Sequence, residues 1–280
     1  MRLRLWHAAD GARIAYREAG TGPPLILLHS AGLSHREFEP AVDGLEHRFR
    51  LVLPDLPAHG DSEDRPRHPY TFDWLAEVLA AFCTDVGGRR PLVGGHGLGA
   101  DLLLRAIELG LLEPGRLVLL PCRLHRPPER PRAEGAMRVA LRTAGLPVLD
   151  RLAGHVAKAT LRPERGTALT ARGVPEAQDL VRHAMADIGG NPNLARSWAR
   201  LARALPRGSR REVLDLLARL DLPVLLLWAD EDRLHPLRGA EEALDLLPDG
   251  MLRVLPGTGY LIAYDDPVGV ARELLSFLSV

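Results

Sequence analysis

The stretch VGGHGLGA, residues 93–100, decides the fold of this chain. It follows an apolar run and precedes DLLLRAIELG, residues 101–110, whose apolar positions recur at helical spacing. Gly95, Gly97 and Gly99 permit a tight turn between the two, because glycine adopts backbone angles that are closed to other residues. The stretch therefore predicts a strand, a sharp turn and a helix in immediate succession.

Other apolar runs along the chain are short, continuous and rich in leucine and valine, which is typical of strands buried on both faces of a parallel sheet. These continuous runs are 24–29, 49–55, 90–95, 115–122, 222–228 and 250–256, and one alternating run covers 12–20. Helical patterns lie between them at 71–86, 97–111, 237–247 and 267–279. The alternation predicts an α/β fold with a mostly parallel, doubly wound sheet and right-handed crossovers.

The segment 123–215 differs from the rest because it contains no convincing buried strand. Four helical patterns separated by proline and glycine fill it, at 134–145, 175–189, 195–205 and 211–220. We therefore expect a core domain made of residues 1–122 and 216–280, with residues 123–215 inserted as a helical cap.

Charge and cysteine content exclude several classes of partner. Basic and acidic residues balance at 36 each, so the net charge indicates neither a nucleic-acid-binding protein nor one bound to anionic membranes. Only Cys83 and Cys122 occur, far apart, which indicates neither a disulfide framework nor a zinc site. The glycines of the turn lack the spacing of a dinucleotide-binding motif. We expect no metal, no other cofactor and no nucleic-acid partner.

The start of the chain, MRLRLWHAADGARIAY, has no apolar segment of the kind found in secretory signals. No run approaches the ~18 apolar residues that a membrane span requires. We expect a cytoplasmic protein without membrane attachment. The sequence leaves open whether it is a monomer or a homodimer.

Five ordered motifs resemble the landmarks of the α/β-hydrolase fold superfamily along nearly the whole chain. The motifs are LLHSAG (27–32), DLPAHGDS (55–62), GGHGLGA (94–100), LLLWADEDRLHP (225–236) and PGTGYLIAYDDPVGVARELLSFL (256–278). The resemblance implies an oxyanion loop, a turn, a nucleophile elbow, a strand bearing the catalytic acid and a segment bearing the catalytic histidine. It also implies the α/β-hydrolase fold with a helical cap.

The same resemblance places Gly97 at the nucleophile, Tyr260 at the base and Asp232 at the acid. A serine hydrolase needs a hydroxyl that attacks and an imidazole that takes its proton. Glycine has no side chain, and a phenol with a pKa near ~10 is a poor base at neutral pH. Only the acid of the triad is kept, so the acyl-enzyme route is closed to this chain.

The backbone donors of the family do not depend on the lost side chains. The resemblance implies an oxyanion hole formed by the N–H of Leu98 and that of Ser30 or Ala31. The helix that begins at Gly97 directs its positive end to the same point. A site of this kind can polarise a carbonyl or stabilise an enolate, phenolate or carboxylate.

Four residues near these positions are candidates for a part in the site. His235 follows Asp232 by three residues and is either a substitute base or a residue of a helix start. His96 adjoins the elbow, and we expect it to pack against neighbouring loops, with ligand binding as the alternative. Cys122 ends a strand at the sheet edge where such folds bind ligands, as a nucleophile or as a packing residue. The Ser30 hydroxyl either assists a bound carbonyl or completes its loop.

At two of the three triad positions, 260 and 232, the role of the side chain has two interpretations. The hydroxyl of Tyr260 is expected to face the site, where it either lines the wall or donates a hydrogen bond to a developing oxyanion. Asp232 is kept either for catalysis or to bind backbone N–H groups of its own turn.

These residues favour an enzyme that acts without a covalent intermediate on an apolar, carbonyl-containing small molecule. Cyclisation, decarboxylation, dehydration, isomerisation or a pericyclic step suits oxyanion donors that hold a ligand in place. Fold analogues in natural-product biosynthesis make that context the expected one. A non-catalytic small-molecule binding protein is one alternative, and a rewired weak ester or lactone hydrolase is the other.

Overall fold

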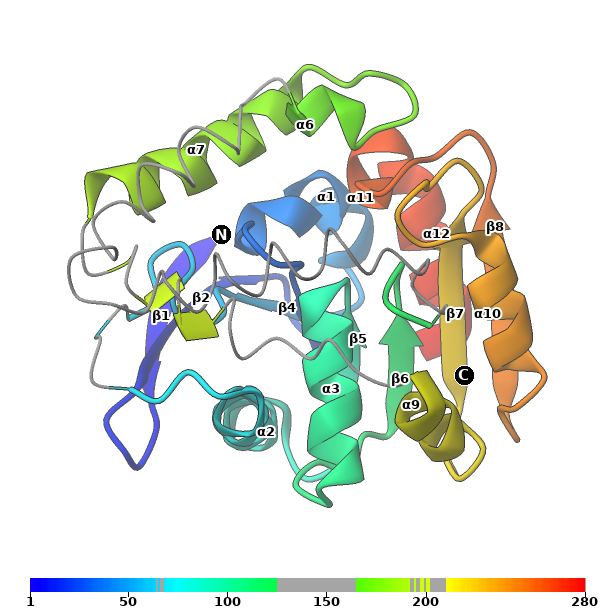
Figure 1. Ribbon diagram of the computed structural model, residues 1–280, viewed down its shortest axis with the longest axis horizontal. Coiled ribbons are helices and arrows are strands. Elements are labelled where there is room, and N and C mark those ends of the chain that lie inside the picture. The colour runs from blue at the N-terminus through cyan, green and yellow to red at the C-terminus, as the bar shows by residue number, and fades with distance from the viewer. Residues whose placement is uncertain are drawn as a thin grey trace, which may run out of the picture.

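The computed structural model describes residues 1–63, 65, 68–124, 165–191, 194, 197–198, 200–201 and 210–279 (Figure 1). One sheet forms its centre, with eight strands in the order β1-β2-β4-β3-β5-β6-β7-β8. The strands are β1 (Arg2–His7), β2 (Arg13–Ala19), β3 (Pro24–Leu28), β4 (Arg50–Pro54), β5 (Leu92–Gly95), β6 (Arg116–Leu119), β7 (Val224–Ala229) and β8 (Gly250–Leu255). β2 pairs antiparallel with β1 and β4, and all other neighbours pair in parallel. The predicted fold class is confirmed.

Both faces of the central strands β3 to β7 are buried, which explains their continuous apolar runs. The run at 250–256 is an exception, because β8 lies at the edge of the sheet and is mostly exposed. Leu25 and Leu27 of β3 belong to one core cluster, whereas Ile26 and Leu28 belong to the other. Successive residues of a strand point to opposite faces, so a strand covered on both sides needs apolar residues at every position.

Helices from distant parts of the chain supply the two covers. The first cover comprises α2 (Phe72–Gly87), α3 (Leu98–Glu108), α9 (Arg210–Leu217) and α10 (Leu237–Leu244). The second comprises η1 (His35–Ala41), α1 (Val42–Leu45), α11 (Ile262–Asp265) and α12 (Pro267–Leu278). No helix in the described ranges is both long and apolar enough to cross a membrane.

The strand β1 lies outside the elements expected from the sequence. Its residues are mostly exposed, and Trp6 alone of the strand packs against a core cluster. An edge strand with so little burial has no apolar run to reveal it. It forms because β2 offers an antiparallel partner, with Leu3 opposite Arg17.

The expected cap, residues 123–215, is described only in part. Within it lie α6 (Arg165–Ala168) and α7 (Glu176–Gly190), which cross the top of the view in Figure 1. The helix expected at 134–145 lies outside the described residues, as do most residues of 195–205. The helix expected at 211–220 is observed as α9, which packs beside α3. Its residues Leu216 and Leu217 belong to the core cluster on that face of the sheet.

Candidate active site

The turn between β5 and α3 has the sharp geometry that its glycines predicted. Gly97 has φ +49° and ψ −113°, a conformation that favours glycine. At Gly99, a Cβ atom would lie only 2.4 Å from the carbonyl oxygen of Leu28. The first turn of α3 therefore lies directly against the end of β3, and its N-terminus faces the site.

The side chain of Tyr260 fills the space beside Gly97. A Cβ atom on Gly97 would lie 2.5 Å from the Tyr260 hydroxyl oxygen and 2.9 Å from the Cβ atom of Ser30. The Tyr260 hydroxyl and the Ser30 side chain therefore lie on the same side of Gly97. The side chain at the position of the base thus places its polar end where a nucleophile at residue 97 would begin.

Two histidine rings flank the ring of Tyr260. The His96 ring lies with its centroid 4.2 Å away, and the His235 ring stacks on Tyr260 at 5.2 Å with 24° between the planes. Desolvation raises the pKa of the Tyr260 phenol well above its ordinary value, and the nearby charge of Glu37 adds to the effect. At neutral pH the phenol is protonated, and it acts as a hydrogen-bond donor rather than as a base.

Asp232 keeps an imidazole partner, although not at position 260. In the loop after β7 its Oδ2 atom lies 3.0 Å from Nδ1 of His235, and its Oδ1 atom accepts a hydrogen bond of 2.7 Å from the Leu234 N–H. Trp228 Nε1 donates to the carbonyl oxygen of His235 at 2.8 Å. Burial opposes ionisation of Asp232, but the hydrogen bond and charge of His235 outweigh it and lower the pKa. The loop holds an oriented carboxylate–imidazole pair.

A buried glutamate, Glu37 of η1, is the site residue that the sequence did not reveal. Its Oε2 atom accepts a 2.7 Å hydrogen bond from the Ser30 N–H, and its Oε1 atom contacts Nδ1 of His96. Burial would raise the pKa of Glu37, but the charge and hydrogen bond of His96 lower it overall. HREFEP, its sequence context, has the polar pattern of an exposed turn, so no local signal distinguishes it.

This contact involves one of the two expected partners of Leu98 in the oxyanion hole. The Ser30 N–H is engaged by Glu37. Within the described part of the chain, the N–H groups of Ala31 and Leu98 have no hydrogen-bond acceptor. Of the two N–H groups expected beside Leu98, that of Ser30 is thus bound within the protein and that of Ala31 is not, within the described residues.

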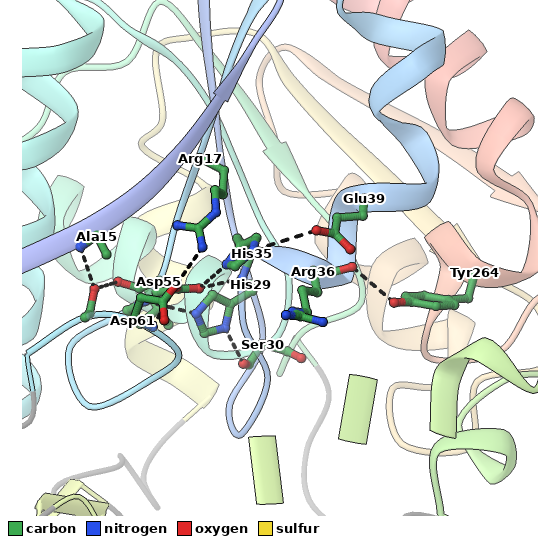
Figure 2. Close-up of polar contacts among 12 residues, drawn as sticks. Ala15, Arg17, His29, Ser30, His35, Arg36, Glu39, Asp55, Asp61 and Tyr264 are labelled. Atoms are coloured by element: carbon green, nitrogen blue, oxygen red, sulfur yellow. Dashed lines mark hydrogen bonds and ion pairs between the residues drawn. The ribbon is translucent and has the colours of Figure 1, made fainter. Parts of the chain in front are cut away.

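The loop that carries Ser30 is fixed by the buried residues His29, labelled in Figure 2, and His59. His29 accepts a hydrogen bond of 2.9 Å from the Leu56 N–H at Nε2 and contacts the Ser30 carbonyl oxygen through Nδ1 at 2.8 Å. His59 Nε2 accepts from the Gly32 N–H at 3.1 Å. Burial lowers the pKa of both histidines, that of His59 to about 3, so both rings are neutral parts of the scaffold.

Beside this loop, Asp55 ties the end of β4 to η1, as Figure 2 shows. Its Oδ1 atom accepts from the N–H of His35 at 2.7 Å and lies 2.8 Å from Nδ1 of the same residue. Its Oδ2 atom accepts from the Asp61 N–H at 2.9 Å. The start of η1 at His35, two residues before Glu37, is thereby held in place.

Cys122 lies beside the site but is poorly suited to attack. It is fully buried, and burial raises the pKa of its thiol well above the ordinary value, with the charge of Asp101 adding to the effect. Arg123 pairs with Asp101 at 2.7 Å. The described residues contain no cluster of three histidine, cysteine or acidic side chains placed to hold a metal ion.

A single carboxylate joins the Tyr260 loop to the segment before α7. The Oδ2 atom of Asp265 accepts 2.8 Å hydrogen bonds from the N–H groups of Gly259 and Ala171, and its Oδ1 atom accepts one of 2.9 Å from Arg172. Above this junction the apolar side chains of α7 pack with those of the loops around Tyr260. This cluster comprises Leu33, Leu169, Ala177, Leu180, Val181, Tyr260, Leu261 and Tyr264.

Comparison with known proteins gives a consistent set of similarities. Residues 25–273 match the family described as "Alpha/beta hydrolase family". The chain is 30% identical over 223 residues to the pimeloyl-[acyl-carrier protein] methyl ester esterase of Aeromonas hydrophila, covering 80% of this chain and 82% of that protein. It is 27% identical over 270 residues to the magnesium-chelatase 30 kDa subunit of Rhodobacter capsulatus, covering 92% and 87%. A solved esterase from Thermogutta terrifontis superposes with a TM-score of 0.77 at 22% identity, covering 100% of this chain and 98% of that one.

Proposed function

Since the chain belongs to the alpha/beta hydrolase family, we propose that it is an enzyme of that family that works without a covalent intermediate. The reaction is a non-hydrolytic step on an apolar, carbonyl-containing small molecule: a cyclisation, decarboxylation, dehydration, isomerisation or pericyclic step. The proposed context is natural-product biosynthesis. No metal and no organic cofactor takes part.

One observation carries the proposal, namely the placement of the Tyr260 hydroxyl 2.5 Å from the Cβ position of residue 97. A protonated phenol at that point can donate a hydrogen bond to a carbonyl oxygen bound between the N–H groups of Ala31 and Leu98. Hydrogen-bond donors preorganised around a developing oxyanion lower the barrier of enolisation and related steps. The hydroxyl itself is not activated as a nucleophile, because its pKa is raised.

His235 is the proposed base of this site. Asp232 fixes its ring through Nδ1 and stabilises the imidazolium that forms when the ring accepts a proton. The stacking of the His235 ring on that of Tyr260 at 5.2 Å supports the proposal that base and donor act on the same ligand. Asp232, His235 and Tyr260 are therefore the proposed catalytic residues.

The surroundings of Tyr260 support the choice of ligand class. The aliphatic side chains of α7 and of the loop residues Leu33 and Leu261 form an apolar cluster with Tyr260. Apolar walls with a few converging polar groups are typical of small-molecule sites. The Aeromonas relative, named as a methyl ester esterase, is consistent with a carbonyl compound as the ligand of a common ancestor.

Proton exchange with the solvent tests the proposal without knowledge of the natural substrate. Cyclohexanone and 2-octanone are incubated with the protein in D2O, and deuterium at the carbons beside the carbonyl is followed by NMR. We expect exchange above the buffer rate with the native protein, and loss of most of it in Asp232→Asn and Tyr260→Phe. Asp221→Asn, a change at an exposed residue, is the matched control.

Hydrolysis of p-nitrophenyl acetate and butyrate is measured alongside. Exchange without hydrolysis supports the proposal. Hydrolysis by the native protein that disappears in Asp232→Asn would show a rewired hydrolase that activates water. Saturable ketone binding with neither exchange nor hydrolysis would show a binding protein, and either of these two results overturns the proposal.

A further inference from the structure

Trp198 is the one tryptophan whose indole N–H donates to no acceptor within the described residues. The other three indole groups donate at 2.7–3.0 Å: Trp6 to Asp85, Trp74 to Asp10, and Trp228 to the carbonyl oxygen of His235. The Trp198 side chain is half-buried, and its nitrogen is not among the buried atoms that lack a partner. A packed tryptophan usually finds a partner for its N–H, so this open donor calls for an explanation.

The ring of Trp198 lies against the turn formed by residues 30–33. The Leu33 N–H donates to the Ser30 carbonyl oxygen at 3.3 Å, which places Ala31 and Gly32 at the tip of the turn. Gly32 has φ +79°, and a Cβ atom there would lie 3.7 Å from Cη2 of Trp198. The indole therefore touches the turn that also presents the N–H of Ala31.

His59 holds the turn and the indole together. Its Nε2 atom accepts a hydrogen bond of 3.1 Å from the Gly32 N–H, and its ring centroid lies 4.6 Å from that of Trp198 with 66° between the planes. Such an edge-to-face contact is a favourable arrangement of aromatic rings. Trp198 is thus fixed beside the oxyanion loop.

The helical segment around Trp198 is anchored from its own side as well. Leu194 and Leu201, four residues before and three residues after Trp198, are buried in the core cluster. This spacing places all three side chains on one face of a helix. The position of the indole is therefore set by packing on both sides of the ring.

We propose that Trp198 is a ligand-binding residue of this site, and that its indole N–H donates a hydrogen bond to a second oxygen of the ligand. This inference rests on the proposed function, in which the N–H groups of Ala31 and Leu98 hold the carbonyl oxygen. The ligand is therefore a carbonyl compound with a second oxygen acceptor close to the first. A 1,3-diketone is the simplest member of that class.

The chemistry of the indole selects this class over simple ketones. Its faces are apolar and can cover the carbon chain of a ligand, whereas its single polar group is a donor. A ligand that covers the ring without offering an acceptor leaves the N–H shielded from water and unpaired, which is unfavourable. Consecutive Cα atoms lie about 3.8 Å apart, so the Ala31 N–H and an indole that touches Gly32 lie within the span of one small molecule.

Two ligands that differ by a single carbonyl test the proposal. Calorimetry measures the Kd of 2,4-heptanedione and of 2-heptanone at pH 7 for the native protein, Trp198→Phe and Trp6→Phe. Phenylalanine at 198 keeps an aromatic ring and removes the N–H. Trp6→Phe is the matched control, because Trp6 lies in the edge strand β1 and its indole already donates to Asp85.

The ratio of the two Kd values isolates the hydrogen bond, since the apolar contacts common to both ligands cancel. Trp198→Phe weakens binding of the diketone relative to 2-heptanone by about 2- to 10-fold, the effect of one hydrogen bond between neutral groups. Trp6→Phe keeps the native ratio. An equal ratio in the native protein and Trp198→Phe overturns the proposal, as does the absence of binding of both ligands.

If Trp198→Phe does not fold, a 5-fluorotryptophan at position 198 of the full chain decides the question by its 19F signal. The signal is expected to shift with the diketone and to saturate at the calorimetric Kd, and an unchanged signal contradicts the proposal. Both measurements report binding without turnover. A changed Kd ratio without deuterium exchange would reject the proposed reaction and keep Trp198 as a ligand-binding residue, whereas exchange with an unchanged ratio would reject only the role of Trp198.

Discussion

The hydroxyl oxygen of Tyr260 lies 2.5 Å from the point where a Cβ atom of residue 97 would be, so the tyrosine at 260 leaves no room for a side chain at 97. A serine at 97 would collide with Tyr260, and a tyrosine at 260 requires glycine at 97. The two departures from the triad are therefore one structural change. That coupling favours a site with a new arrangement over a hydrolase that has merely lost a residue.

Restoring a serine at the elbow is predicted to destabilise the protein. In Gly97→Ser the new Cβ atom would lie 2.5 Å from the Tyr260 hydroxyl oxygen. The serine would also have to adopt the backbone conformation of Gly97, with φ +49°. Overpacking and backbone strain of this kind each cost about 1–3 kcal/mol. Urea denaturation should show a loss of stability of that size or somewhat more, with no gain of p-nitrophenyl acetate hydrolysis.

Two further variants separate the collision from the strain. Gly110 has φ +69° and nothing within 4 Å of its Cβ position, so Gly110→Ser measures backbone strain alone. Removing the hydroxyl in the double variant Gly97→Ser/Tyr260→Phe should recover part of the stability. Equal losses in Gly97→Ser and Gly110→Ser, with no recovery in the double variant, would show that Tyr260 does not occupy this space.

Both cysteines are predicted to be unreactive in the folded protein. Cys83 and Cys122 are fully buried, and burial raises the pKa of Cys83 to about 12 and that of Cys122 well above its ordinary value. The thiolate is the reactive form, so Ellman's reagent at pH 7–8 should label neither residue before urea is added and both afterwards. Rapid labelling of one thiol in the native protein, absent in Cys122→Ser, would restore Cys122 as a candidate nucleophile.

The fold could be predicted from the sequence because its signals are local. Doubly covered strands such as β7 must be apolar at every position, and the glycines at 95, 97 and 99 mark a turn that few other sequences can form. The strand β1 was not predicted, because an exposed edge strand is defined by its pairing partner rather than by its own sequence pattern.

Residues of the site could be predicted from the sequence only where they lie in recognisable motifs. Gly97, Asp232 and Tyr260 stand at recognisable positions, and the proximity of His235 to Asp232 follows from a spacing of three residues. The role of Glu37 depends on contact with His96, 59 residues away, across the end of the sheet. No local pattern encodes a contact of that range.

Asp265 is predicted to be the main polar support of the Tyr260 loop. It is 3% exposed and accepts hydrogen bonds from the N–H groups of Gly259, Ala171 and Arg172. Asp265→Ala leaves these donors without an acceptor and should lower the free energy of unfolding by about 2–4 kcal/mol. Hydrogen exchange at the amides of Ala171 and Arg172 should become faster at the same time.

Asp265→Asn retains one carbonyl acceptor and should lose less than Asp265→Ala. An alanine at the exposed Asp221 is the control for removal of a surface carboxylate. If the amides of residues 171 and 172 stay protected in Asp265→Ala, the prediction is wrong. The contact between α7 and the loops around Tyr260 would then be sufficient to hold the segment before α7.

Acid should destabilise the protein through its buried scaffold histidines. The pKa of His59 is about 3 in the folded protein and about 6.5 in the unfolded chain, so the unfolded chain binds more protons between these values. Stability therefore falls as the pH drops from about 6.5 towards 3, at up to about 1.4 kcal/mol per pH unit for this residue, and His29 adds to the slope. His59→Gln should lower stability at pH 7, because Gly32 loses its acceptor, yet flatten the decline below pH 6.5. His47→Gln, at an exposed residue, should leave the slope unchanged, and a slope in His59→Gln as steep as in the native protein would contradict the neutral state of His59.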